Sequence, residues 1–170
     1  MRDLSKKGLR ILVIQKLGAT EVANLNQIGR TPSANDDSAS GGRLPTILLV
    51  EDTEDNRQMM KKLLEMSGYL VLEATNGEEA VQVTSAESPE LILMDLSLPV
   101  IDGLAATRLI RNLPNGNHLP IIAVSAHDTA DFHADALAAG CDAYITKPIN
   151  YPELEEIVES LMAKPKTRSE

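Results

Sequence analysis

Short apolar runs alternate with longer amphipathic segments between residues 44 and 163. Five of these runs have the length of a β-strand and contain few polar residues: TILLV (46–50), LVLEA (70–74), LILM (91–94), IIAV (121–124) and AYIT (143–146). Segments of helical length follow the runs, at 54–67, 77–86, 103–113, 130–139 and 152–162. Strands that are apolar on both faces are typical of a parallel sheet with helices packed on both sides. The sequence therefore predicts an α/β fold, a three-layer sandwich of five βα units.

Residues with known preferences at helix ends support these boundaries. Methionines and leucines between 59 and 66 recur at helical spacing, and Gly68 follows where the helix should end. Asn76 precedes GEEA and is an expected N-cap, with acidic residues in the first turn. Pro152 fits the first position of the last helix.

Charge and cysteine content limit the class of protein. The chain of 170 residues has a formal net charge of -9, whereas surfaces that bind nucleic acid in general are basic. Its apolar runs are too short to span a bilayer. The single cysteine, Cys141, suits a reducing compartment. We therefore expect a cytoplasmic protein that binds neither nucleic acid nor membrane.

Composition also divides the chain into parts. Residues 31–42, TPSANDDSASGG, are small, polar or turn-forming, and such a segment buries too little apolar surface to fold. Residues 1–30 carry six basic and two acidic residues, whereas residues 44–170 carry nine basic and twenty-one acidic ones. An extension that docks on the acidic body through its positive charge is the alternative to a flexible one. We expect a flexible N-terminal extension and linker over 1–43, a domain without an attached output module over 44–163, and a disordered tail over 164–170.

Polar side chains stand where the predicted strands end. They are Glu51 and Asp52 after the first strand, Asp95 after the third, Ser125 after the fourth and Lys147 after the fifth. Each alone could be a helix cap or a solvated loop residue. In a parallel sheet, however, the carboxyl ends of the strands meet at one edge, which is where ligands bind. Five polar groups at that edge predict a functional site.

Three carboxylates held together repel one another, and a hard divalent cation such as Mg²⁺ relieves that repulsion through oxygen ligands. Asp52 and Asp95 would be direct ligands, Glu51 would act through water, and a backbone carbonyl just past Asp95 would complete the set. A lysine and a hydroxyl beside such a site suit a phosphoryl group, whose transfer needs charge neutralisation and positioning. Lys147 and Ser125 would each contact a phosphoryl oxygen, and Asp95 would be the nucleophile that forms an acyl phosphate.

Four motifs in this order resemble the receiver domain of two-component response regulators over residues 45–163. They are VEDTEDNR with Glu51 and Asp52, LILMDLSLPVIDG with Asp95, VSAH with Ser125, and YITKP with Tyr144, Lys147 and Pro148. The resemblance implies a flavodoxin-like fold with strand order 2-1-3-4-5 and a bound Mg²⁺, with the backbone carbonyl of Ser97 among its ligands. It also implies phosphorylation of Asp95 by the phosphohistidine of a sensor histidine kinase or phosphotransfer protein.

The resemblance further implies a switch. Ser125 would move toward the phosphoryl group while Tyr144 turns inward, which reshapes the face made by the fourth helix, fifth strand and fifth helix. A downstream protein of unknown identity would dock on this face, and a homodimer that forms on phosphorylation is a further expectation. GCDAYITKPIN (140–150) resembles single-domain regulators of cell-cycle phosphorelays and receivers of hybrid kinases.

The roles of several other polar residues are less specific. Ser97 and His127 are expected to flank the path of water to the acyl phosphate and to tune its lifetime, although His127 could equally be an exposed loop residue without a role. His118 and His133 are expected on the surface. Cys141, next to a strand, is expected to be a small buried thiol.

These features favour a binding switch that catalyses only its own phosphorylation and dephosphorylation. A phosphorelay intermediate or a receiver fragment of a hybrid kinase uses the same residues and is the alternative. A metal-dependent aspartyl-phosphate phosphatase would need a second acid two residues past its nucleophile, where Ser97 stands. An inert scaffold would not need the set of Asp52, Asp95, Ser125 and Lys147.

Overall fold

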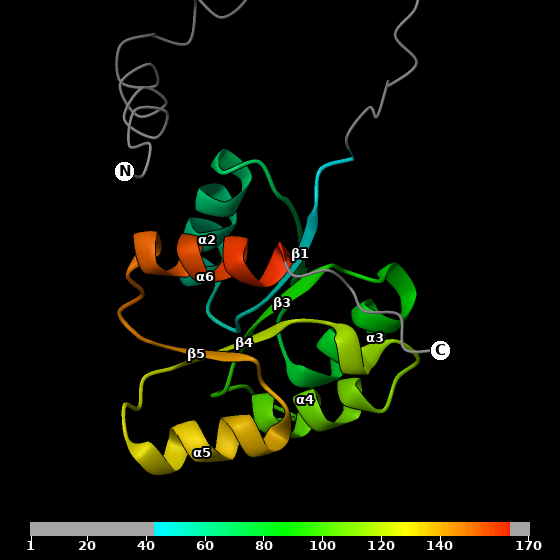
Figure 1. Ribbon diagram of the computed structural model, residues 1–170, viewed down its shortest axis with the longest axis vertical. Coiled ribbons are helices and arrows are strands. Elements are labelled where there is room, and N and C mark those ends of the chain that lie inside the picture. Colours follow the sequence, from blue (N-terminus) through cyan, green and yellow to red (C-terminus); the bar gives the residue numbers. More distant parts are fainter. Residues whose placement is uncertain (1–42, 164–170) are drawn as a thin grey trace, which may run out of the picture. The chain divides into compact units, whose positions relative to one another are not determined.

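The computed structural model describes residues 43–163 (Figure 1). The predicted extension over 1–43, apart from residue 43, and the predicted tail over 164–170 lie outside the described residues. The strands are β1 (Thr46–Val50), β2 (Leu70–Ala74), β3 (Leu91–Asp95), β4 (Ile121–Ser125) and β5 (Ala143–Thr146). The helices are α2 (Glu54–Met66), α3 (Gly77–Glu87), α4 (Gly103–Arg111), α5 (Ala130–Ala139) and α6 (Tyr151–Met162), with a 3-10 turn, η2, at Gly116–His118.

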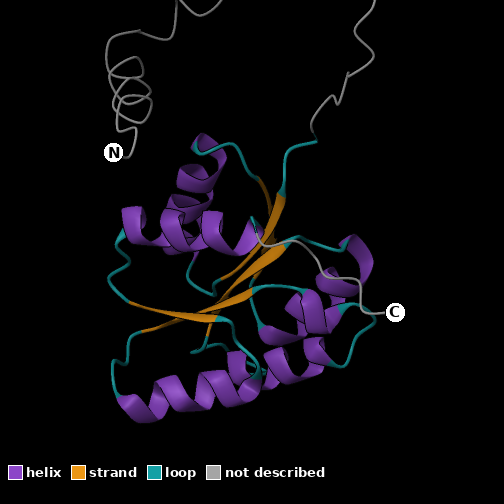
Figure 2. Ribbon diagram, viewed as in Figure 1, coloured by secondary structure: helices purple, strands orange, loops and turns teal. Residues whose placement is uncertain are grey.

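All strand pairs are parallel, and the order in the sheet is β2-β1-β3-β4-β5. Figure 2 shows α2 and α6 on one face of the sheet and α3, α4 and α5 on the other. The expected flavodoxin-like three-layer sandwich is therefore confirmed. β3 and β4 each extend one residue beyond the apolar run, because backbone pairing continues through Asp95 and Ser125.

Aliphatic side chains fill both spaces between sheet and helices. Successive residues of a strand point to opposite faces. Ile47 and Leu49 of β1 accordingly pack toward α2 and α6. Leu48 and Val50 pack toward α3, α4 and α5. Cys141 is buried, as expected, and burial raises the pKa of its thiol. In the described part of the chain no helix has the length and apolar character needed to cross a membrane.

Most of the predicted helix ends hold. Asn76 caps α3 by accepting a hydrogen bond from the backbone N–H of Glu79 at 2.9 Å. Gly68, just past α2, has a φ of +89°, which favours glycine. Pro152 takes the second position of α6 rather than the first, because the helix begins at Tyr151. The N–H of either position has no partner within the helix, so proline is tolerated at both.

A partly buried arginine joins several segments at the amino-terminal edge of the sheet. The Arg111 guanidinium donates to the carbonyls of Gly140, at 2.6 and 2.9 Å, and Leu119, at 2.7 Å, and also to that of Gly116. It forms an ion pair with Asp142 at 2.9 Å. Arg111 thus ties the end of α4 to the starts of β4 and β5, far along the strands from their carboxyl ends.

Candidate metal and phosphoacceptor site

The sheet brings three carboxylates together where the strand order reverses. Val50, the last residue of β1, pairs with Met94 of β3. The residues that follow them, Glu51 and Asp95, therefore lie side by side. Asp52 follows at once. One oxygen atom of each of these three acids lies within 4.8 Å of the others. The crevice at such a reversal is the usual ligand site of an open α/β sheet.

The three acids differ in burial. Asp95 is 3% exposed and Glu51 is 7% exposed, whereas Asp52 lies on the surface. Asp95 Oδ1 accepts a hydrogen bond from the backbone N–H of Ser97 at 2.8 Å. Glu51 Oε1 accepts one from the N–H of Thr53 at 3.2 Å. The buried acids are thereby oriented by the loops that follow them, and Asp52 faces solvent.

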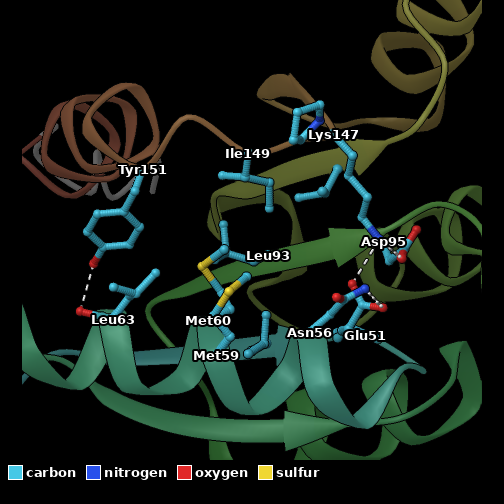
Figure 3. Close-up of a pocket in the computed structure, with 14 residues that line it drawn as sticks. Glu51, Asn56, Met59, Met60, Leu63, Leu93, Asp95, Lys147, Ile149 and Tyr151 are labelled. Atoms are coloured by element: carbon cyan, nitrogen blue, oxygen red, sulfur yellow. Dashed lines mark hydrogen bonds and ion pairs between the residues drawn. The ribbon is translucent and has the colours of Figure 1, made fainter.

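Lys147 follows directly after β5 and places its ammonium among the carboxylates. Its Nζ lies 2.5 Å from Asp95 Oδ2 and 2.8 Å from Glu51 Oε2, so one ammonium bridges two buried carboxylates (Figure 3). Burial by itself lowers the pKa of Lys147, but the hydrogen bonds to Asp95 and Glu51 outweigh it, and the pKa is raised. Lys147 is therefore a cation at neutral pH. Its backbone N–H donates to the Ser125 carbonyl at 2.7 Å, and its peptide bond to Pro148 is cis.

Ser125 and Tyr144 are connected through the loop after β4. Ser125 is buried one residue past Val124, the residue that pairs with Asp95. Its Oγ accepts a hydrogen bond from the His127 N–H at 3.1 Å. The Tyr144 hydroxyl donates to the His127 carbonyl at 2.6 Å. His127 thus links Ser125 to Tyr144 through its backbone.

The two histidines near this loop make ring contacts. His127 has an exposed ring, stacked on Phe132 with centroids 4.3 Å apart. His133 was expected to be an ordinary surface residue, but its ring stacks on Tyr144 at 3.9 Å and its Nε2 lies 3.1 Å from Asp128 Oδ1. His118 is exposed, as expected. The stacking partners lie on other segments of the chain, which explains why the sequence did not reveal them.

Sequence reasoning also missed an apolar cavity of about 560 Å³ that leads away from the acids. Met59, Met60, Leu63, Ile149 and Tyr151 line it between α2 and α6 (Figure 3). Helical spacing placed the methionines on α2, and of the three Met60 is buried. Met59 is 56% exposed at the cavity and Met66 is 71% exposed, because the apolar stripe of α2 is wider than its buried face.

The acidic cluster fits a hard divalent cation. Its donors are carboxylate oxygens, the ligands that Mg²⁺ prefers, and one acid is open to solvent where the ion would keep water ligands. Two buried carboxylates share a single lysine, so the cluster retains negative charge. The backbone N–H of Ser97 contacts Asp95, and the expected role of the Ser97 carbonyl as a ligand stays a prediction.

The sheet is parallel and has the order β2-β1-β3-β4-β5, and its carboxyl edge carries three carboxylates, a lysine and a buried serine. These features define the receiver class of signalling proteins. The model of the response regulator receiver domain family matches residues 47–159, and the chain belongs to this family.

Similar proteins include a response regulator and the receiver domains of two histidine kinases. The chain is 36% identical over 117 residues to the polar-differentiation response regulator DivK of Brucella anthropi, a match that covers 69% of this chain and 95% of the relative. It is 36% identical, with a TM-score of 0.68, to the receiver domain of sensor histidine kinase PA1611 from Pseudomonas aeruginosa PAO1, covering 72% of this chain and all of that one. That structure has a magnesium ion coordinated in its active-site cleft. A receiver domain of a Syntrophus aciditrophicus histidine kinase is 32% identical, with a TM-score of 0.67, and the match covers 74% of this chain and 95% of that one.

Proposed function

We propose that Asp95 accepts a phosphoryl group from the phosphohistidine of a sensor histidine kinase or a phosphotransfer protein, and that the resulting conformational change alters partner binding. The observation that carries this proposal is the position of Lys147, whose ammonium bridges Asp95 and Glu51 beside a cluster of three carboxylates. A charged nucleophile, a neighbouring cation and oxygen ligands for a metal are the components that phosphoryl transfer needs.

Asp52 and Asp95, with the backbone carbonyl of Ser97, would hold Mg²⁺ directly, and Glu51 would hold it through water. When bound, the ion supplies positive charge that offsets the charge on the transferred phosphoryl oxygens. Asp95 Oδ would attack phosphorus, the bond from phosphorus to the histidine nitrogen would break, and an acyl phosphate would remain on Asp95. Lys147 would then pair with a phosphoryl oxygen.

Ser125 and Tyr144 would turn phosphorylation into a signal. The Ser125 hydroxyl accepts a hydrogen bond from the His127 N–H and would exchange it for a bond to the phosphoryl group. Tyr144 would leave the His127 carbonyl and turn inward. The face formed by α5, β5 and α6 would change shape, and a downstream protein or a second copy of the chain would bind there. Ser97 and His127 would flank the water that hydrolyses the acyl phosphate.

A phosphorelay role is the second candidate, because the similar solved structures include receivers of histidine kinases. We do not expect catalysis on a separate substrate, since Ser97 stands where a phosphatase of this chemistry would carry an acid. The free, buried thiol of Cys141 suits a reducing cytoplasm, where we place the protein.

The test of the proposed function is intact mass after incubation with Mg²⁺ and a small-molecule phosphodonor. The parent chain should gain one phosphoryl group, and peptide mapping should place it on Asp95. Asp95→Asn and Asp52→Ala should both largely prevent the gain, the first by removing the nucleophile and the second by removing a metal ligand. Full phosphorylation of Asp95→Asn on the same peptide would show that another residue is the acceptor.

A further inference from the structure

Arg57 is a buried arginine whose donors point at the backbone of the acidic loop. It lies in the first turn of α2 and is 8% exposed. Its NH1 donates to the carbonyl of Glu51 at 3.0 Å and to the carbonyl of Asp52 at 3.4 Å. Both carbonyls belong to acids of the candidate metal cluster. The guanidinium therefore contacts the main chain of the two residues that would present carboxylates to the ion.

Arg57 is itself fixed from two directions. Its Nε donates to Glu73 Oε2 on β2 at 3.2 Å, and NH2 forms an ion pair with Glu54. Glu73 also pairs with Lys61 of α2. The planar guanidinium holds several acceptors at set angles, which a lysine ammonium does not do. The contacts of Arg57 thus brace the loop after β1 against the neighbouring strand.

We propose that Arg57 is a positioning residue for the metal site, which holds the main chain of Glu51 and Asp52 so that their carboxylates are arranged for a divalent cation. The inference rests on the proposed function, because it assumes that the acidic cluster binds Mg²⁺. Groups that orient metal ligands commonly change metal affinity by about 10- to 100-fold when they are removed. Arg57 would act through the backbone and touch neither the ion nor the phosphoryl group.

Charge alone predicts the opposite effect. Arg57 carries a positive charge near a cluster that would bind a cation, and its removal would leave Glu54 and Glu73 without this partner. A purely electrostatic role therefore means that Mg²⁺ binds more tightly once Arg57 is neutralised. A positioning role means that Mg²⁺ binds more weakly. The direction of the change in Mg²⁺ affinity therefore distinguishes a positioning role from a purely electrostatic one.

The experiment is a Mg²⁺ titration of the full chain, followed through backbone amide shifts of residues 51–53 and 95–97. Arg57→Met removes the charge and keeps much of the apolar part of the side chain. Arg57→Lys keeps the charge but loses the planar guanidinium that contacts several acceptors at once. The matched control is Arg111→Met, since Arg111 also donates to several carbonyls but at the amino-terminal edge of the sheet. We expect about tenfold weaker Mg²⁺ binding for Arg57→Met, an intermediate loss for Arg57→Lys, and the parent affinity for Arg111→Met.

Two results would overturn the inference. One is that Arg57→Met binds Mg²⁺ as tightly as the parent or more tightly. The other is that Arg111→Met loses as much Mg²⁺ affinity as Arg57→Met, which would mean that the loss comes from general destabilisation of the fold. If Arg57→Met does not fold, Arg57→Lys applies the same test, because it keeps the positive charge, so that only a positioning role predicts weaker Mg²⁺ binding. A parent chain that does not bind Mg²⁺ at all would instead refute the proposed metal site.

A phosphorylation assay gives a second readout. If Arg57 only positions the metal ligands, saturating Mg²⁺ should restore the phosphorylation rate of Arg57→Met toward that of the parent. A rate that stays low at saturating Mg²⁺ would contradict a role limited to metal binding.

Discussion

Lys147 Nζ lies 2.5 Å from Asp95 Oδ2, although 52 residues separate them in the chain. The same ammonium lies 2.8 Å from Glu51 Oε2, so the last strand is joined to the first and third by one cation. This ion pair occupies the place where a phosphoryl group would add. Under the proposed function, Lys147 would therefore pair with Asp95 before phosphorylation and with a phosphoryl oxygen after it.

The first prediction concerns the cost of losing that cation. Lys147→Ala leaves two buried carboxylates without their shared partner, and unsatisfied buried groups cost about 1 to 3 kcal/mol. We expect a lower free energy of unfolding in urea without metal, and a larger rise in melting temperature on adding Mg²⁺ than the parent shows, because the ion replaces the lost positive charge. Lys61→Ala is the control, since its partner Glu73 lies outside the acidic cluster. An equal response to Mg²⁺ in all three chains would contradict the prediction.

The second prediction tests the switch. Ser125→Ala should still be phosphorylated on Asp95 but should respond weakly, because a hydrogen bond to a charged acceptor contributes about 1.5 to 3 kcal/mol. The measurement is the change in backbone amide shifts over residues 125–162 when beryllofluoride and Mg²⁺ mimic the acyl phosphate. Shifts confined to the metal site in the parent chain would rule out switching and favour a pure relay.

The third prediction isolates the Tyr144 hydroxyl. Tyr144→Phe removes its bond to the His127 carbonyl and should loosen residues 126–129, which would speed their amide hydrogen exchange. Tyr151→Phe is matched to it, because Tyr151 donates to the Leu63 carbonyl at 2.8 Å on the other side of the sheet. The control should leave exchange over 126–129 unchanged, and an equal effect would disprove a specific coupling.

The fourth prediction concerns His133, whose ring covers Tyr144. Stacked aromatic pairs contribute about 0.5 to 1.5 kcal/mol, so His133→Ala should release Tyr144 from its present position. We expect the Tyr144 ring signals of the unphosphorylated variant to shift toward those of the beryllofluoride-bound parent. His118→Ala removes an exposed histidine and should leave these signals in place. If both variants keep the parent spectrum, His133 does not hold the ring.

The fifth prediction concerns the backbone behind the acceptor. A Cβ atom added at Gly103 would lie 2.2 Å from the Asp95 carbonyl oxygen and 2.8 Å from Leu96 Cα, so the main chain must shift. Gly103→Ala should lower the free energy of unfolding by about 1 to 3 kcal/mol, as overpacking usually does, and should slow phosphorylation of Asp95. Gly68→Ala is the comparison, because its Cβ would meet nothing within 4 Å and only its φ is strained. The Gly68→Ala variant should have a lower free energy of unfolding than the parent, but its Asp95 should be phosphorylated at the parent rate.

Local pattern was enough to predict the strands and the polar groups that end them. Asp95 follows four apolar residues, and the carboxyl edge of a parallel sheet gathers such groups whatever the strand order. The order itself does not follow from the apolar runs and was expected only from the resemblance. Arg57 was missed because its contact with Glu73 requires α2 to pack beside β2, which the local pattern does not show. The contact of His133 with Tyr144 likewise requires α5 to pack beside β5.

β3 is hydrogen-bonded on both sides, and all five of its residues are buried. Amide hydrogens in such a strand exchange with solvent only through large openings of the domain, whereas those of surface loops exchange through small local ones. Asp95 therefore ends a strand whose amides we expect to exchange slowly, and the loop at 96–102, where we expect faster exchange, begins at the next residue. A phosphoryl group on Asp95 would add charge at the end of this strand, beside a loop that we expect to open more often than the strand does. Under the proposed function, phosphorylation would change mainly which loop conformations are populated, and the unchanged sheet would be the frame relative to which a partner protein distinguishes them.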